Sequence, residues 1–244
     1  MSSGDALPPP PWSAGGRRRP PRAKPPLTRE AIVEAALAIV DAEGLEAATM
    51  RRVAHALDTG PASLYQHVAG KDELLELLFD RVAAEIELPP PPPPGGDWQE
   101  PLKAVCRSTR DAYARHRDIA YVTLGRIPTG ANALAVAEAM LAIMDAGGVP
   151  PDVSTYAIDA LSLFVGATAY EESISATQFG GHGSEYFETV HAYFAALPLE
   201  RFPTLARLAD RLTRPETREG ERFEFALDVQ VCGIAALTAD ASGG

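Results

Sequence analysis

A short stretch around position 65 gathers side chains that can bind phosphates and the edges of bases. Ser63, Tyr65 and His67 can donate hydrogen bonds to phosphate oxygens, and Lys71 adds a positive charge four residues later. Gln66 lies between them and can form two hydrogen bonds with adenine. These residue types favour contact with a nucleic acid, in which phosphate contacts set the position and Gln66 reads a base.

Several of these side chains also have a plainer interpretation. Tyr65 can serve mainly to pack against the fold, and His67 can be an ordinary surface histidine. Arg51, a basic residue further upstream, can be a solvated charge that pairs with Glu46 or Asp72. Both sets of alternatives remain open at the level of the sequence.

The spacing of the apolar residues has a helical period, and it predicts the helices that position these residues. A first helix begins after Thr28, an N-cap candidate, and ends at Gly44, with apolar residues at i, i+3, i+4 and i+7 between them. A second helix over 49–57 repeats this stripe after Thr49, another N-cap candidate. No convincing strand pattern or internal repeat is present, so the sequence predicts an all-α fold.

A third, short helix carries the residues around position 65. The turn 58–60 precedes Pro61, which suits the first helical position of a helix over 61–68. Leu64 and Val68 form its buried edge, and its outer surface then consists of Ala62, Ser63, Tyr65, Gln66 and His67. Two short helices joined by a tight turn are typical of a helix-turn-helix unit that binds DNA. A fourth helix over 72–88, capped by Asp72, is expected to link this unit to the rest of the chain.

Two proline-rich stretches divide the chain. Residues 1–27 contain eight prolines and five basic residues, which predicts a disordered arm that is either solvated or enters a minor groove through Arg17, Arg18 and Arg19. Six consecutive prolines at 89–94, followed by two glycines, predict a linker over 89–96. The expected units are therefore a helix-turn-helix domain over 28–88 and a larger helical domain over 97–239.

The charge distribution supports a local anion-binding role. The net charge of −11 by itself argues against nucleic acid, because Lys and Arg supply most of the non-specific affinity for phosphates. However, residues 1–71 carry a net charge of +2, and the remaining residues carry −13. This asymmetry places the basic character beside the predicted DNA surface.

Several strings within 28–88 resemble the N-terminal domain of TetR-family transcriptional regulators. The strings are Thr28-Arg29-Glu30-x-Ile32, Glu43-Gly44-Leu45, Thr49-x-Arg51-x-Val53-Ala54 and Ala62-Ser63-Leu64-Tyr65-x-His67-Val68-x-x-Lys71. The resemblance covers this region without a gap. One departure lies in the turn, which is commonly Leu-Gly-Val in the family and is Leu57-Asp58-Thr59 here. Asp tolerates a left-handed backbone better than most residues, so we expect the turn to be kept.

The resemblance implies a role for each matching position. It implies that Arg51 reaches a base edge and that Pro61, Ala62 and Gln66 face the major groove. It implies phosphate contacts for Thr49, Ser63, Tyr65, His67 and Lys71.

The C-terminal part resembles, more loosely, the ligand-binding and dimerisation domain of the tetracycline-repressor branch. The resembling strings are Trp98-Gln99, His116-Arg117-Asp118, Leu124-Gly125-x-x-Pro128-Thr129, Gly166 and Phe223-x-Phe225-x-Leu227-Asp228. The resemblance implies helical packing around a pocket for a small molecule, without identifying that molecule.

The departures from that branch bear on the ligand. Tetracycline repressors bind their drug through a magnesium ion held partly by a histidine, and Thr123 stands at the matching position. Residues that grip the drug are replaced by Glu87, Val105 and Thr109. We therefore expect no metal or other cofactor and a mostly apolar effector. The expected pocket is lined by Val105, Thr109, Thr123, Leu141, Phe164 and Ala167, although apolar residues on a helix more often belong to the core.

Two long helical patterns, over 152–177 and 220–239, have more apolar surface than one neighbour needs. Such an excess commonly marks the interface of a two-fold dimer, and in the family these helices form a four-helix contact. The apolar residues concerned are Tyr156, Leu163, Val165, Ala169, Phe225, Leu227, Val231, Ile234 and Leu237. Two copies of the recognition helix would then read a near-palindromic operator.

The remaining patterns argue against other functions. The histidines and two cysteines show no nucleophile elbow, metal spacing or phosphate loop, so we do not expect an enzyme. The longest apolar run, 160–170, is too short to cross a bilayer, and with two cysteines and no secretory signal a cytoplasmic protein is expected. The sequence thus predicts a ligand-responsive repressor that binds DNA as a homodimer and is released by a small apolar molecule. The alternative is a helical adaptor that does not bind DNA.

Overall fold

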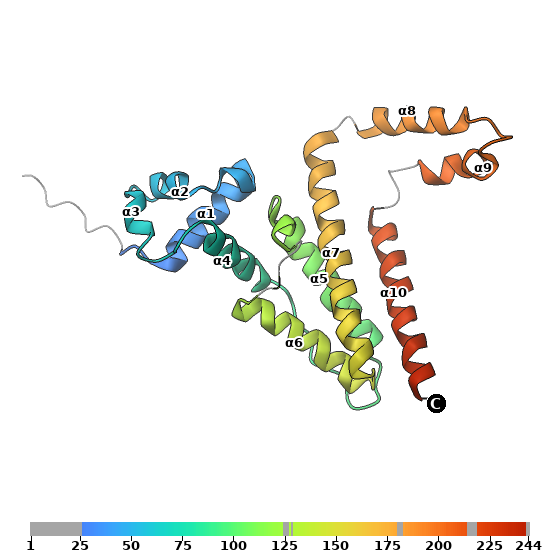
Figure 1. Ribbon diagram of the computed structural model, residues 1–244, viewed down its shortest axis with the longest axis horizontal. Coiled ribbons are helices and arrows are strands. Elements are labelled where there is room, and N and C mark those ends of the chain that lie inside the picture. The colour runs from blue at the N-terminus through green and yellow to red at the C-terminus, as the bar shows by residue number, and fades with distance from the viewer. Residues whose placement is uncertain (1–25, 124–126, 128, 180–182, 214–218, 243–244) are drawn as a thin grey trace, which may run out of the picture.

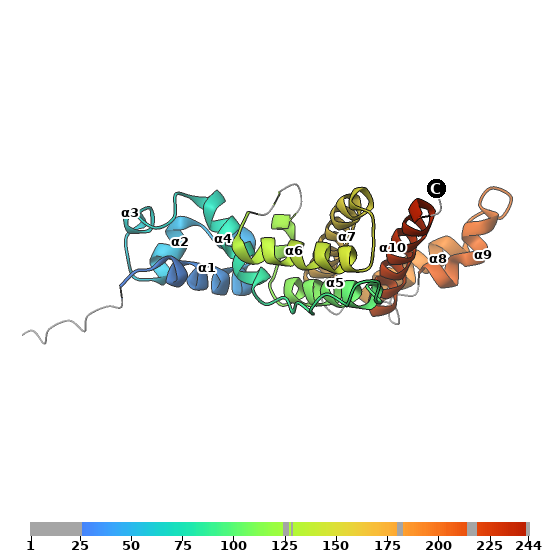
Figure 2. The same ribbon diagram turned by 90° about the horizontal axis from the view of Figure 1, so that it is seen from below.

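The structure, a computed structural model, describes residues 26–242 except 124–126, 128, 180–182 and 214–218. Within these ranges the chain forms only helices, which confirms the all-α prediction. The molecule is elongated, with the small N-terminal unit at one end and the long helices α7 and α10 toward the other (Figures 1 and 2). No helix of the described residues is both long and apolar enough to cross a membrane. The predicted basic arm falls almost entirely on residues outside the described ranges.

The first helix of the N-terminal unit begins and ends as the sequence predicts. In α1 (Arg29–Glu43), the Thr28 hydroxyl accepts a hydrogen bond from the Ala31 amide at 3.1 Å. Gly44 ends the helix with a φ of 91°, a conformation that side chains with a Cβ rarely adopt. The following 3-10 turn η1 (Leu45–Ala47) leads the chain toward α2.

The helix α2 (Met50–Ala56) and the turn after it form the first half of the helix-turn-helix unit. Thr49 caps α2, because its hydroxyl accepts a hydrogen bond from the Arg52 amide at 3.2 Å. Asp58 has a φ of 49°, and the Thr59 amide donates to the Ala54 carbonyl at 3.0 Å. The replacement of glycine by Asp58 is therefore accommodated in a left-handed turn, as expected.

The third helix is shorter than predicted. Regular helix extends only over α3 (Pro61–Leu64), instead of 61–68. The chain continues as hydrogen-bonded turns, in which the amides of His67 and Val68 both donate to the Leu64 carbonyl at 2.9 Å. Leu64 and Val68 are both buried, so their packing, and not the length of the helix, fixes this segment.

The linking helix α4 (Lys71–Ala83) also ends before its predicted limit of 88. It begins after Gly70, so Asp72 lies in its first turn and does not cap it as predicted. At its end, the Glu87 amide donates to the Ser108 hydroxyl at 2.7 Å instead of to a helical carbonyl. The prolines that follow lack an amide hydrogen and prevent further helix.

The larger unit is built around the central helix α7 (Pro151–Phe179). This helix packs against α5 (Gln99–Ala114), α6 (Ala131–Ala146) and α10 (Glu219–Ser242), and the short η2 (Ile119–Thr123) lies beside it. Ion pairs hold α10 against α5: Arg107 contacts Glu224 at 2.8 Å, and Lys103 contacts Asp228 at 2.5 Å. The two long helices thus match the predicted patterns over 152–177 and 220–239.

Two further segments lie outside this bundle. The helices α8 (Gly183–Ala195) and α9 (Pro203–Leu212) pack against each other and project beyond the ends of α7 and α10 (Figure 1). The proline run 89–94 leads toward α5, and after it the Gly95 amide donates to the Ala146 carbonyl at the end of α6, at 2.8 Å. The linker is therefore fastened to the bundle at its C-terminal end.

Candidate DNA interface and ligand cavity

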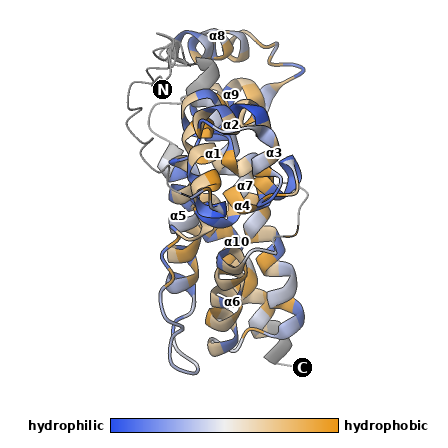
Figure 3. Ribbon diagram, turned by 90° about the vertical axis from the view of Figure 1, so that its left-hand side faces the viewer, coloured by the Kyte–Doolittle hydropathy of each residue, from blue (hydrophilic) through white to orange (hydrophobic). Residues whose placement is uncertain are grey.

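The predicted DNA surface lies exposed on the helix-turn-helix unit, where hydrophilic residues follow α2 and the chain beside α3 (Figure 3). The side chain of Tyr65 is 54% exposed, while Leu64 and Val68 face inward. The exposed predicted residues are Thr49, Arg51, Pro61, Ala62, Tyr65, Gln66 and Lys71, and the half-buried ones are Ser63 and His67. The fold therefore leaves all nine predicted side chains at least partly accessible.

The basic residues near this surface differ in what they contact. Arg52 binds Glu43 at 2.5 Å, and this hydrogen bond lowers the pKa of the Glu43 carboxyl and raises that of the Arg52 guanidinium. By contrast, no carboxylate of the described residues lies within 4.0 Å of the Arg51 guanidinium. Glu46, one of its two alternative partners, instead contacts Lys71 at 3.5 Å. Within the part of the chain that the structure describes, Arg51 is therefore available for another anion.

Two further contacts shape the same surface. Arg29 donates to the His67 carbonyl at 3.1 Å and binds Glu73 at 2.7 Å. These contacts fix the end of the segment 61–68, here called the recognition segment, to α1 and α4. Thr49 accepts the capping hydrogen bond of α2, and its own hydroxyl hydrogen remains available for a phosphate.

A cavity of about 450 Å³ lies in the larger unit, between α4, α5, α6 and α7. Thr109 and Thr123, two of the six predicted lining residues, do line it. Most of the other lining residues are apolar, and they include Phe79 and Ile86 from the α4 end and Met140 from α6. The size and the apolar walls are those of a site for a small organic molecule.

The other four predicted residues do not line this cavity. Val105 is fully buried in the core next to Cys106, which takes the lining position on α5. Phe164 stacks on Phe223 with 5.3 Å between ring centroids. Leu141 and Ala167 are exposed on the outer sides of α6 and α7. These four residues lie away from the cavity because apolar periodicity marks a helix face without saying which neighbour that face meets.

Two titratable groups in the cavity wall stay neutral. Burial raises the pKa of the Cys106 thiol to about 12 and also raises the pKa of the Tyr113 hydroxyl. Cys106 is therefore an unreactive, apolar-like wall residue at neutral pH. Tyr113 packs against Phe79 with 5.8 Å between ring centroids.

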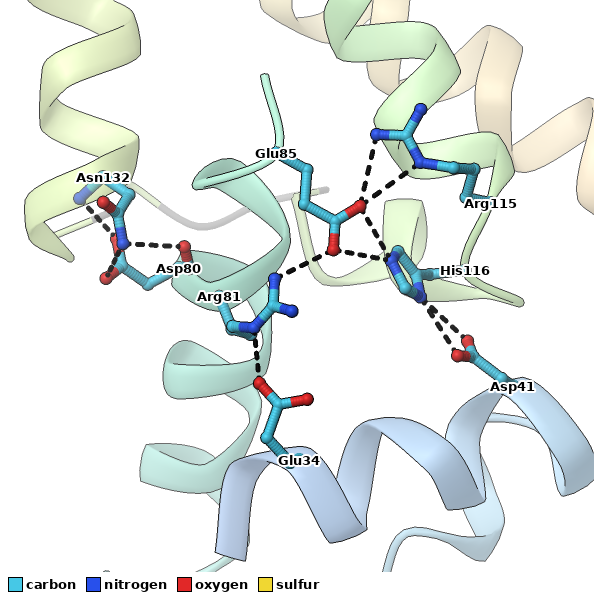
Figure 4. A network of polar contacts seen from close by, with 8 residues as sticks. All are labelled: Glu34, Asp41, Asp80, Arg81, Glu85, Arg115, His116 and Asn132. Atoms are coloured by element: carbon cyan, nitrogen blue, oxygen red, sulfur yellow. Dashed lines mark hydrogen bonds and ion pairs between the residues drawn. The ribbon is translucent and has the colours of Figure 1, made fainter. Parts of the chain in front are cut away.

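A polar network joins the DNA-binding unit to the cavity-bearing unit (Figure 4). The His116 ring lies 3.0 Å from Asp41 of α1 and 3.2 Å from Glu85, just beyond α4. Glu85 also contacts Arg81 at 2.8 Å, and Arg81 contacts Glu34 of α1 at 2.6 Å. Burial alone would raise the pKa of the Glu85 carboxyl, but hydrogen bonds from His116 and Arg81 lower it below its ordinary value. Helix α1, the end of α4 and the end of α5 are thus held together.

A second joint connects α4 to α6 (Figure 4). The Asp80 carboxylate accepts hydrogen bonds from the amides of Asn132 and Ala133 at 2.8 and 3.0 Å, so a side chain of α4 caps the first turn of α6. A Cβ on Gly130 would lie 2.2 Å from the same carboxylate. Glycine is required there because Asp80 occupies the space of a side chain.

A third joint connects the end of α1 to α7. Asp118, with a φ of 59°, accepts a hydrogen bond from the Leu45 amide at 3.4 Å and another from the Ser173 hydroxyl at 3.2 Å. The string His116-Arg117-Asp118, which carried the family resemblance, therefore lies where the two units meet. The roles of Asp80, Glu85 and Tyr113 had no comparable signal, since their partners are distant in the sequence.

A helix-turn-helix surface joined by one helix to a hollow helical bundle defines a class of transcription regulators in which one chain both binds DNA and holds a ligand. Residues 32–78 match the family described as "Bacterial regulatory proteins, tetR family", and residues 90–238 match "Tetracyclin repressor-like, C-terminal domain". The chain belongs to the TetR family of ligand-responsive transcription regulators. Regulators of this family bind DNA operators and small molecules and function as dimers.

Relatives support this assignment over most of the chain. The HTH-type transcriptional repressor DrrR1 of Streptomyces coeruleorubidus is 35% identical, with 90% of this chain and 82% of the relative covered. The tetracycline repressor protein class E of Escherichia coli is 28% identical, with 86% and 92% covered.

Solved structures agree with the fold. Apo ActR from Streptomyces coelicolor superposes with a TM-score of 0.81 and 41% identity, covering 90% of this chain and all of that one. The structure of ActR in complex with actinorhodin gives a TM-score of 0.80 at 41% identity, covering 86% of this chain and 96% of the other.

Proposed function

We propose that this regulator is a cytoplasmic repressor that binds a near-palindromic operator as a homodimer and leaves it when a small molecule enters the cavity. The proposed units are 28–88 for DNA binding, 89–96 as linker and 97–239 for ligand binding and dimerisation. The proposed base-reading residues are Arg51 and Gln66, with Pro61 and Ala62 against the groove. The proposed phosphate contacts are Thr49, Ser63, Tyr65, His67 and Lys71.

One observation carries the proposal: α4 connects the two sites directly. It begins at Lys71, next to the recognition segment. Near its other end Phe79 and Ala83 line the cavity, as does Ile86 just beyond the helix. A helix of this length spans about 20 Å and moves as a rigid rod. A ligand that binds better to one orientation of α4 therefore also selects one orientation of the DNA-binding unit.

Exposed apolar residues support a dimer through α7 and α10. Tyr156 of α7 is 79% exposed, and Phe225 and Leu237 of α10 are 71% and 57% exposed. Leu163 of α7 is 50% exposed and also lines the cavity, so it lies between the cavity and the proposed interface. The other five residues expected at the interface are instead buried inside the protomer, namely Val165, Ala169, Leu227, Val231 and Ile234. They lie on the opposite faces of the same helices, so the proposed interface uses only the outward face.

The walls of the cavity favour an effector without a histidine-bound magnesium ion. Thr123 stands where tetracycline repressors have a histidine, and its hydroxyl already donates to the Ala120 carbonyl at 2.8 Å. A Cβ on Gly166 would lie 2.5 Å from that hydroxyl, so α7 approaches Thr123 closely. A small, mostly apolar molecule fits this environment better than a metal chelate.

The proposal is tested by a mobility shift with the DNA upstream of the protein's own gene. We expect sequence-specific retention that is abolished by a compound from a small-molecule panel, which should include actinorhodin because ActR was crystallised with it. An Arg51→Ala, Gln66→Ala double variant should lose the preference for this DNA over random sequence. Absence of retention at every salt concentration would contradict the proposal and favour a helical adaptor.

A further inference from the structure

The hydroxyl groups of the two threonines that line the cavity already donate hydrogen bonds to backbone carbonyls. Thr109 donates to the Val105 carbonyl at 2.8 Å, and Thr123 donates to the Ala120 carbonyl at 2.8 Å. A hydroxyl has one hydrogen and two acceptor lone pairs. Both threonines can therefore offer a ligand only an acceptor.

The charged groups of the wall are also acceptors. Asp159 of α7 lines the cavity at an exposed position, and no cation of the described residues pairs with it. Glu76 lines it too but is already engaged by another group of the protein, so the argument depends on Asp159. The lining residues that the structure describes include no lysine, arginine or histidine. A lone carboxylate at this exposed edge of the apolar walls attracts a cation and disfavours a second anion.

Tyr113 supplies the complementary donor. It is only 8% exposed, and its hydroxyl makes no hydrogen bond with any other described residue. Among the described residues no fully buried polar side-chain atom lacks a partner, so the Tyr113 hydroxyl retains some exposure. Tyr113 lines the cavity, which makes the cavity the space that this hydroxyl can face. Since burial raises its pKa, this hydroxyl is protonated and can donate to a ligand oxygen.

We infer that the effector is a compact apolar ring system that carries a protonated amine toward Asp159 and an acceptor toward Tyr113. The inference rests on the proposed function of the cavity as the effector site and names the chemical class that enters it. Apolar walls bind the ring system, whereas the unpaired carboxylate of Asp159 selects the sign of the ligand's charge.

Three probes of nearly equal shape test the charge preference: 9-(aminomethyl)anthracene, 9-anthracenemethanol and anthracene-9-carboxylate. They are titrated into the full-length protein without DNA, and binding is followed by anthracene fluorescence. We expect the amine to bind about tenfold or more tightly than the alcohol, and the carboxylate to bind most weakly. Because DNA is absent, the result is independent of operator binding.

Two variants assign the effect to residues. Asp159→Asn should remove the advantage of the amine and leave the affinity for the alcohol unchanged. The matched control is Asp152→Asn, which removes the same charge from another exposed position of α7, in its first turn and outside the cavity lining, and should leave all three affinities unchanged. Tyr113→Phe should weaken the alcohol, which can accept a hydrogen bond, more than the amine.

The outcomes separate this inference from the proposed function. Equal affinities for the three probes, or tightest binding of the carboxylate, would overturn the preference for a cation while operator binding and its release by other compounds stand. An unchanged amine preference in Asp159→Asn would likewise overturn the role of that carboxylate.

Discussion

At the scale of single residues, the proposed DNA surface includes side chains that the described part of the protein leaves without a bound partner. Arg29 and Arg52 are tied to internal partners, whereas Arg51 has no carboxylate within reach among the described residues. Tyr65 stands out from the short α3 segment while its neighbour Leu64 anchors that segment. Available cations and hydroxyls on one exposed face are what a phosphate backbone requires.

The Tyr65 hydroxyl can be tested with a single-atom change. Tyr65→Phe should weaken binding to operator and random DNA alike, by at least about tenfold, because a hydrogen bond to a charged group contributes about 1.5–3 kcal/mol. Fluorescence anisotropy with both DNAs measures this. Tyr193→Phe, at an exposed tyrosine of α8, is the control and should bind normally. An unchanged affinity of Tyr65→Phe would remove this hydroxyl from the phosphate contacts.

Sequence reasoning was most successful at this scale. The caps Thr28 and Thr49 and the left-handed Asp58 could be predicted because each depends on residues close by in the chain. The cavity residues could not, because a residue's position on a helix does not tell which of several neighbours it will face. Tyr113 and Asp80 act through partners that come from other helices, and no local sequence pattern predicts these contacts.

At the scale of elements, polar contacts hold the C-terminal end of α4 to its neighbouring helices. Asp80 caps α6, while Arg81 and Glu85 bind α1 and the end of α5. The sequence predicted the helix but placed its end five residues too late, since the hydrogen bond from Glu87 to Ser108 that competes with the helix spans 21 residues.

The α4–α6 joint is sensitive to one added carbon atom. Gly130→Ala would place a Cβ 2.2 Å from the Asp80 carboxylate and so break the cap of α6. We expect the free energy of unfolding to fall by about 1–3 kcal/mol, the usual cost of overpacking. Urea denaturation followed by circular dichroism measures it. Gly220→Ala has open space around its Cβ and should change stability little; an equal loss in both variants would contradict the steric argument.

The network at Glu85 makes stability depend on pH. Its carboxyl has a pKa below the ordinary 4.5, so it stabilises the fold above about pH 4.5, and this contribution disappears as the pH falls through the lowered pKa. Glu85→Gln should therefore destabilise the protein at pH 7 and differ less from the wild type near pH 4. Urea midpoints at the two pH values give the comparison. A difference that does not shrink in acid would show that the charge of Glu85 is not what stabilises the junction.

At the scale of the whole molecule, the arrangement is a rod with the DNA-binding unit at one end and two long helices toward the other (Figure 1). The outward faces of α7 and α10 combine large apolar residues, such as Tyr156 and Phe225, with small ones, such as Ala160 and Gly233. Small residues allow helices of two protomers to approach closely, while the large ones supply the buried area. The sequence predicted these helices correctly but could not separate their inner from their outer faces.

The outer face is tested by placing charge on it. Phe225→Glu should give monomers in analytical ultracentrifugation at micromolar concentration, because two carboxylates would be buried near the two-fold axis. Its affinity for the operator should fall by roughly 10²-fold or more, since a separate monomer must then bind each half-site. Leu134→Glu, at a similarly exposed leucine of α6, should remain dimeric. A dimeric Phe225→Glu protein would place the interface elsewhere.

The central helix α7 has a consequence for how the gene responds to its inducer. Ile158, Leu161 and Val165 line the cavity, whereas Tyr156 and Ala160 lie on the exposed face that we propose contacts a second copy. A compound that shifts this helix in one half of a dimer therefore disturbs the empty half as well. Induction should rise over a narrower range of inducer concentration than a hyperbola allows, with a Hill coefficient above one. Expression of the regulated gene would then change little at low concentrations of the compound and rise steeply over a narrow range of higher concentrations.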